Sequence, residues 1–160
     1  KILNMVPKST VLIIIRNGED VVNSIISRAH CYPEKFGEQK HPDYGIKLWN
    51  RALKGASRAL VSPRAKLVVY EDFISAPDRY ADQLTSIPVF SGFARDDIKQ
   101  MSLDTRQSLE PWKNKSFSTP KRVCLKYHPE FLNNRAYINS KLNQNLYRDI
   151  VRNHKQHEPI

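Results

Sequence analysis

The sequence predicts an α/β fold in which a parallel sheet is flanked by helices. Two strand–turn–helix units follow one another in the first half of the chain, and this order favours parallel strands joined by right-handed crossovers. The 160 residues, 40% apolar and 26% charged, are enough for one soluble domain with a sizeable core. The longest aliphatic run, residues 11–15, is too short to cross a bilayer, so no membrane span is expected in this stretch.

The first unit begins with a strand and continues into a helix. Residues 11–15 form a β-branched and aliphatic run, which is typical of a strand buried on both faces of a parallel sheet. Arg16-Asn17-Gly18 interrupts this run, and Glu19 and Asp20 follow where negative charge favours a helix N-terminus. Aliphatic side chains at helical spacing then predict a helix over residues 19–29 that packs on the sheet.

The second unit repeats this order. Residues 30–42 contain two prolines and a glycine, and we expect a loop there. Apolar residues at helical spacing, Trp49 among them, predict a helix over residues 43–60. Residues 66–70 predict the second strand, and the proline at position 77 predicts a third helix near residues 77–86.

The remainder of the chain has weaker periodicity and most of the positive charge. We expect a short helix over residues 94–103, loop with short elements over residues 104–135, and a polar helix over about residues 136–155. Of the net charge of +10, residues 1–110 carry +3 and residues 111–160 carry +7. This surplus points to an anionic partner, which could be a phosphorylated cofactor, a nucleic acid, an acidic polymer or a membrane surface.

Two residues of the first unit could bind an anion. Ligands of open parallel sheets bind beyond the carboxyl ends of the strands, where Arg16 is expected. Its guanidinium can present a planar fork of donors to a phosphate or sulfate, and Ser24, on the same helical face as Asp20, could add a hydroxyl. The alternative is that Arg16 is a solvated charge at the strand end and that Ser24 lies at a helix–sheet contact.

Several other kinds of site find no support. The chain has no G-x-x-x-x-G-K-[ST] and no G-x-G-x-x-G phosphate motif. Its histidines form no H-E-x-x-H pair, and Cys31 and Cys124 form no C-x-x-C, so no metal site is expected. The two cysteines leave the redox compartment open.

The sequence IIIRNGEDVVNS at residues 13–24 resembles the strand–turn–helix of sulfotransferases that use 3′-phosphoadenosine 5′-phosphosulfate (PAPS). Their pattern is an apolar strand followed by R-[ND]-P-x-D-x-x-x-S. The resemblance implies that Arg16 and Ser24 bind the 3′-phosphate of the nucleotide, with Asp20 at the motif aspartate. Gly18 stands where the family usually has proline, which loosens the turn without removing a ligand.

Two further segments resemble the same family. Residues 67–73, with the proline at position 77, are similar to its Y-E-D-[LM]…P segment, which implies that Tyr70 contacts the adenine. Trp112-Lys113-Asn114 with Phe117 is similar to the W-K-N-x-F-T of the cytosolic branch. There a basic R-K-G stretch closes on the 3′-phosphate, and Arg106 alone stands near its place.

The resemblance covers residues 8–118 and implies a nucleoside-triphosphate-hydrolase-like sulfotransferase fold. Residues 1–160 would then be a single partial domain, of which residues 119–160 form a basic, mostly helical segment. The family's 5′-phosphosulfate loop and general base lie upstream of the arginine strand, and only 15 residues precede Arg16. We therefore expect an N-terminally incomplete domain, inactive in isolation, whose catalytic residues lie upstream of Lys1.

The activity implied is transfer of a sulfuryl group from PAPS to a hydroxyl or amine acceptor, without a metal. The acceptor stays open, as does the compartment, which could be the cytoplasm or the Golgi lumen. The alternative is a non-catalytic basic module that binds nucleic acid or acidic polysaccharide through residues 111–160. In this alternative the basic side chains would alternate with aromatic ones, which are Tyr127, Phe131, Tyr137 and Tyr147.

A nucleotide kinase is a third possibility, which the R…D…S motif and the Y-E-D segment disfavour. We therefore expect a nucleotide cofactor as the partner and no specific nucleic acid.

Overall fold

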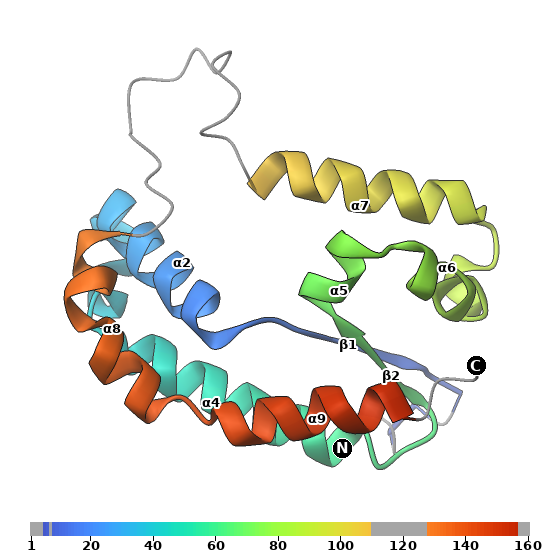
Figure 1. Ribbon diagram of the computed structural model, residues 1–160, viewed down its shortest axis with the longest axis horizontal. Helices are drawn as coiled ribbons and strands as arrows, with labels where there is room; N and C mark the ends of the chain where they lie inside the picture. Colours follow the sequence, from blue (N-terminus) through green and yellow to red (C-terminus); the bar gives the residue numbers. More distant parts are fainter. Residues whose placement is uncertain (1–4, 7, 110–127, 157–160) are drawn as a thin grey trace. The chain divides into compact units, whose positions relative to one another are not determined.

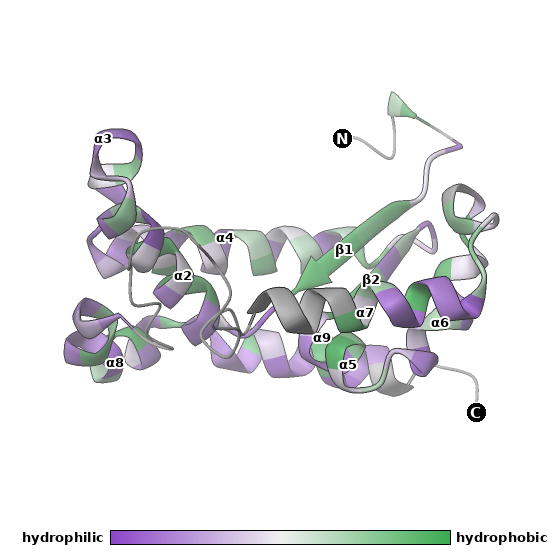
Figure 2. Cartoon of the chain, turned by 90° about the horizontal axis from the view of Figure 1, so that it is seen from above, coloured by the Kyte–Doolittle hydropathy of each residue, from purple (hydrophilic) through white to green (hydrophobic). Residues whose placement is uncertain are grey.

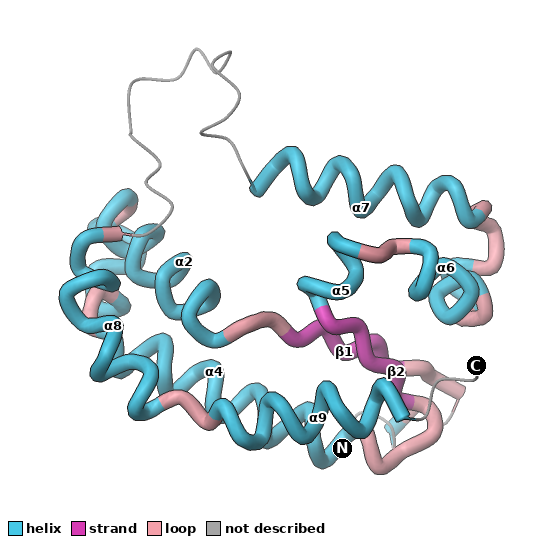
Figure 3. Tube along the Cα trace, in the orientation of Figure 1, coloured by secondary structure: helices cyan, strands magenta, loops and turns pink. Residues whose placement is uncertain are grey.

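Figure 1 shows the computed structural model, which describes residues 5–6, 8–109 and 128–156. The fold is α/β and mostly helical, with a two-stranded parallel sheet of order β1-β2 (Figure 3). The predicted α/β class and the parallel strands are thus confirmed. The chain divides into two compact units, of which one comprises residues 1–67 and 127–160 and the other residues 68–126.

The first unit begins with β1 (Val11–Ile15) and α2 (Gly18–Cys31), close to the predicted bounds. Asn17 caps the helix, because its side-chain oxygen accepts a hydrogen bond of 2.8 Å from the Glu19 N–H. Figure 2 shows β1 as an unbroken hydrophobic segment. The expectation that both faces of this strand are buried is wrong for Ile14, which is 62% exposed. Burial on both faces needs a covering layer on each side of the sheet, and among the described residues the face that carries Ile14 is not covered.

The segment predicted as a loop over residues 30–42 contains two short helical turns, α3 (Pro33–Phe36) and η1 (Gly37–Gln39). They are followed by α4 (Pro42–Ala59), which agrees with the predicted helix to within one residue. The two long helices α2 and α4 pack closely at Gly45, where an added Cβ would lie 3.3 Å from the Val22 backbone. Glycine at this position therefore sets the separation of the two helices.

The C-terminal part of the first unit contains two helices, α8 (Pro129–Lys141) and α9 (Gln144–Gln156). The prediction of one helix over residues 136–155 was wrong, because Asn50 of α4 stabilises a break. Its side chain donates to the Lys141 carbonyl oxygen at 2.9 Å and accepts from the Asn143 N–H at 2.8 Å. The loop expected over residues 104–135 is helical at both ends, and residues 110–127 lie outside the described part of the chain.

The second unit consists of α5 (Tyr70–Ser75), α6 (Asp78–Thr85), η2 (Pro88–Phe90) and α7 (Arg95–Leu109). It follows β2 (Ala65–Val69), so the expectation that the strand extends to Tyr70 was wrong. The buried Tyr80 is held in place by its hydroxyl, which accepts from the Val69 N–H at 3.3 Å. The predicted helix over residues 77–86 is α6, and the short helix over residues 94–103 extends to residue 109 as α7.

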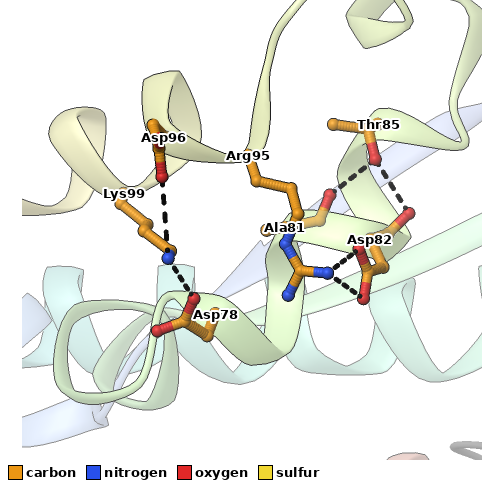
Figure 4. Close-up of polar contacts among 7 residues, drawn as sticks. All are labelled: Asp78, Ala81, Asp82, Thr85, Arg95, Asp96 and Lys99. Atoms are coloured by element: carbon orange, nitrogen blue, oxygen red, sulfur yellow. Dashed lines mark hydrogen bonds and ion pairs between the residues drawn. The ribbon is translucent and has the colours of Figure 1, made fainter.

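Two ion pairs join α6 to α7 on the surface of the second unit (Figure 4). Arg95 contacts Asp82 at 2.8 Å, and Lys99 contacts Asp78 at 2.7 Å. Between the helices of this unit, the Ser102 hydroxyl donates to the Phe73 carbonyl oxygen at 3.0 Å. These contacts fix α7 over α5 and α6.

In the first unit, α8 begins at a stacked pair of histidines. The His30 and His128 rings have centroids 4.2 Å apart, and His128 Nδ1 accepts from the Glu130 N–H at 3.2 Å as the N-cap of α8. Burial and the neighbouring His30 lower the pKa of His128 below its ordinary value, against the opposing effect of Glu130. The cap is therefore a neutral imidazole at pH 7, which can accept a hydrogen bond.

We expect the first unit to lose stability in mild acid through His128. Because the pKa of His128 is lower in the folded chain, the unfolded chain takes up the proton first as the pH falls below about 6.5. The free energy of unfolding, measured by urea titration, should therefore decrease between about pH 7 and about pH 5.5. Asparagine caps a helix without titrating, so His128→Asn should show a smaller decrease. Equal decreases in the two proteins would contradict this origin.

Candidate functional site

The turn between β1 and α2 is the best-defined candidate site. Arg16 follows the last residue of the strand, and Gly18 is the first residue of the helix. The N–H groups of the first helical turn and the helix dipole give this position a partial positive charge. A helix N-terminus that follows a strand is a common place for a phosphate to bind.

The Arg16 guanidinium lies over the first turn of α2, where it forms an ion pair with Asp20. The Nη2 and Oδ2 atoms are 3.5 Å apart, and the two side chains are 31% and 36% exposed. An ion pair with this exposure contributes roughly 0–1 kcal/mol, whereas a hydrogen bond to a charged group contributes about 1.5–3 kcal/mol. A phosphate can therefore compete with Asp20 for the guanidinium.

Ser24 lies one turn beyond Asp20 on α2, and its side chain is exposed. Residues four apart share a helical face, so Asp20 and Ser24 lie on one side of the helix. The Arg16–Asp20 contact places the guanidinium at the start of that side. The exposure of Ser24 does not fit the alternative that it packs between the helix and the sheet.

The backbone of this turn is held by Trp49 of α4. The indole Nε1 donates to the Arg16 carbonyl oxygen at 2.9 Å, and the ring is 4% exposed. The same ring packs against Gly18, where an added Cβ would lie 3.0 Å from two ring carbons and 2.9 Å from Leu142 Cδ1. The sequence indicates only that Trp49 lies on the apolar face of its helix, because apolar spacing does not reveal a hydrogen bond to a residue 33 positions away.

A second support comes from α8, which the sequence did not predict in this place. Arg135 contacts Glu19 Oε2 through two nitrogens, at 2.8 and 3.1 Å, and Asn139 donates to Glu19 Oε1 at 2.5 Å. Glu19 stands in the first turn of α2, where its charge would repel a bound anion. The contacts from α8 compensate that charge and fix the carboxylate.

The other predicted ligands belong to the second unit. Tyr70 is the first residue of α5 and is half-buried. Arg106 belongs to α7, but its side chain lies outside the described part of the structure, as do residues 112–117. The assignments of Tyr70 and Arg106 to the cofactor stay predictions.

No metal or membrane-spanning element emerges where the structure is described. Residues 5–6, 8–109 and 128–156 contain no group of three or more His, Cys, Asp or Glu side chains that could hold a metal ion. Within the same ranges, no helix combines the length and the apolar character needed to cross a bilayer.

No family model, curated protein or solved structure matches this chain. The resemblance to sulfotransferases therefore stays a prediction from the sequence motifs, above all those around Arg16 and Tyr70. What the structure adds is the local geometry of the first of these motifs.

The packing at Gly18 gives a test of this geometry by two identical substitutions. Gly18→Ala should lower the free energy of unfolding by about 1–3 kcal/mol, because the new methyl group collides with the Trp49 ring. Gly55→Ala in α4 should raise it by about 0.5–1 kcal/mol, because no atom lies within 4 Å of the new Cβ and alanine favours the helix. Urea unfolding measures the change in the free energy of unfolding for each variant. Changes of the same sign in the two variants would contradict the described packing.

Proposed function

We propose that this chain supplies the 3′-phosphate and adenine side of a PAPS site in a sulfotransferase. The enzyme would transfer a sulfuryl group from PAPS to a hydroxyl or amine acceptor. The observation that carries the proposal is the turn after β1, where the Arg16 guanidinium lies against Asp20, on the same side of α2 as the exposed Ser24. The proposed fold is the sulfotransferase form of the nucleoside-triphosphate-hydrolase architecture, to which this chain would contribute the strand before Arg16.

Each ligand of the proposed site has a distinct role. The Arg16 guanidinium presents two parallel donors to phosphate oxygens, which a lysine in its place could not do. Ser24 adds one hydroxyl donor from the same side of α2. Asp20 keeps the guanidinium over the helix until the phosphate replaces it as the partner.

The proposed contribution to catalysis is positioning rather than bond making. Sulfuryl transfer resembles phosphoryl transfer, in which the attacking and leaving oxygens must lie in line. Arg16 and Ser24 would anchor one end of the nucleotide, and Tyr70 would contact the adenine, so that the sulfate end points at the acceptor. Loss of an anchor should weaken nucleotide binding, and turnover would fall through misplacement of the sulfate.

The alternative of a basic module in residues 111–160 gains little from the described residues. Phe131 is fully buried, and Tyr147 packs against Trp49 with ring centroids 5.8 Å apart. Tyr137 donates a hydrogen bond of 2.5 Å to Asp43 Oδ1. Phe131 and Tyr147 therefore serve the packing of α8 and α9. Tyr137 is 41% exposed and is the one exposed ring of the three, whereas a platform for stacked bases needs several.

The proposal predicts that Arg16 is responsible for recognition of the 3′-phosphate. The wild-type chain should bind 3′-phosphoadenosine 5′-phosphate more tightly than adenosine 5′-phosphate, which lacks that group. Arg16→Ala should weaken binding of the first nucleotide by about 10- to 100-fold, in line with the loss of charged hydrogen bonds. It should leave binding of the second nearly unchanged. Isothermal titration calorimetry measures both affinities.

Arg148→Ala is the matched control, because this exposed arginine lies on α9 and bonds only to Gln144 and Asn145 among the described residues. It removes the same charge and should leave both affinities unchanged. If Arg16→Ala retains the preference for the 3′-phosphorylated nucleotide, Arg16 does not bind that phosphate.

A further inference from the structure

A line of positive charge runs along the exposed side of α4. Lys47, Arg51, Lys54 and Arg58 follow one another at intervals of four, three and four residues, and all four are exposed. This spacing places them on one face of the helix, opposite its buried side. We call these four residues the α4 stripe. The buried side consists of Ile46, Trp49, Leu53 and Ala56, with Pro42 and Gly45.

The charges of the α4 stripe are not compensated by the described residues. None of the four side chains forms a hydrogen bond or an ion pair with another described residue. The helix has one acidic residue, Asp43, which contacts Tyr137 and His41 instead. Other described basic side chains do face carboxylates, as Arg135 faces Glu19 and Arg95 faces Asp82.

This arrangement costs the helix stability. Like charges three or four residues apart repel each other, and the α4 stripe contains three such pairs in succession. A single Glu in place of one of these residues would convert repulsion into attraction. A feature that is locally unfavourable and uncompensated is a mark of a functional surface.

We propose that the α4 stripe binds an acidic polysaccharide. The four charges extend over about 16 Å along the helix axis, at a rise of about 1.5 Å per residue. A linear polymer with repeated sulfate or carboxylate groups can lie along such a line and release bound counterions from each charge it meets. The surface is separate from the proposed nucleotide site, because Trp49, which supports the Arg16 turn, points to the opposite side of α4.

The side chains around the α4 stripe favour a polysaccharide over a nucleic acid. Stacking of single-stranded bases needs a row of exposed aromatic rings. On α4 the amide of Asn50 bonds to the α8–α9 turn, and the Trp49 ring is buried. The exposed ring of Tyr44 lies one turn before the stripe begins. Tyr44 is three residues from Lys47 and is the one exposed ring that the described helix α4 places beside the stripe, which is too few for successive bases to stack on.

The test uses the full chain, heparin as the probe and two double variants with the same change in net charge. One variant carries Arg51→Gln and Lys54→Gln in the α4 stripe. The other carries Lys35→Gln and Arg152→Gln, which are exposed residues outside α4 and also without a described side-chain partner. The stripe variant should bind heparin about tenfold more weakly and show a salt dependence reduced by about two released ions. The control variant should change little.

Stability and nucleotide binding provide the remaining readouts. The stripe variant should melt at the same temperature as the wild type or higher, because repulsion within α4 is relieved. Its affinity for 3′-phosphoadenosine 5′-phosphate should be unchanged, so the outcome is independent of the proposed enzymatic function. Equal losses of heparin binding in both variants, or no heparin binding by the wild type, would overturn the proposal. Tighter binding of a single-stranded RNA through the same residues would overturn the choice of polymer.

Discussion

The hydrogen bond from Trp49 to the Arg16 carbonyl oxygen is the contact on which the arrangement of the first unit depends. It joins the middle of α4 to the turn between β1 and α2, at a distance of 2.9 Å and away from solvent. The indole ring can reach this position only because residue 18 has no side chain. The Leu142 side chain also packs against Gly18, from the turn between α8 and α9. The side chain of Asn50 in α4 fixes this turn through hydrogen bonds to the backbone of Lys141 and Asn143. If the Trp49 Nε1 donor were buried without this acceptor, the folded state would lose about 1–3 kcal/mol of stability. The turn after β1 and α4 are therefore held in one fixed arrangement.

This packing explains why residue 18 is a glycine, which the motif alone did not explain. Compared with the proline usual in sulfotransferases, glycine was expected to loosen the turn. In the structure the Asn17 cap and the Trp49 hydrogen bond hold the turn, and any Cβ at position 18 would collide with the indole ring. The glycine is therefore a consequence of packing. It allows the arginine of the motif to keep a defined position, which a binding site for an anion requires.

The parts of the fold that could be predicted from the sequence are those set by local patterns. The aliphatic run of β1 and the apolar spacing of α2 and α4 gave bounds close to the observed ones, since burial of one face determines these elements. The parts that could not be predicted depend on distant partners. The break after Lys141 requires Asn50, and the docking of α8 requires Glu19, more than 100 residues earlier in the chain than Arg135. At the candidate site, Arg16, Asp20 and Ser24 were singled out by the resemblance to the sulfotransferase motif, whereas Trp49, Leu142 and Arg135 show no local signal of their role.

The most direct test of the central claim is a double-mutant cycle between Trp49 and Arg16, with the affinity for 3′-phosphoadenosine 5′-phosphate as the readout. Trp49→Phe keeps an aromatic ring at this position and removes the Nε1 donor that holds the Arg16 backbone, although the smaller ring leaves a cavity where the indole contacted Gly18. If Trp49 positions Arg16 for the phosphate, this substitution weakens binding several-fold in the wild-type chain and has no further effect in the Arg16→Ala chain. An equal loss of affinity in both backgrounds would show that Trp49 acts independently of Arg16 and would contradict the claim.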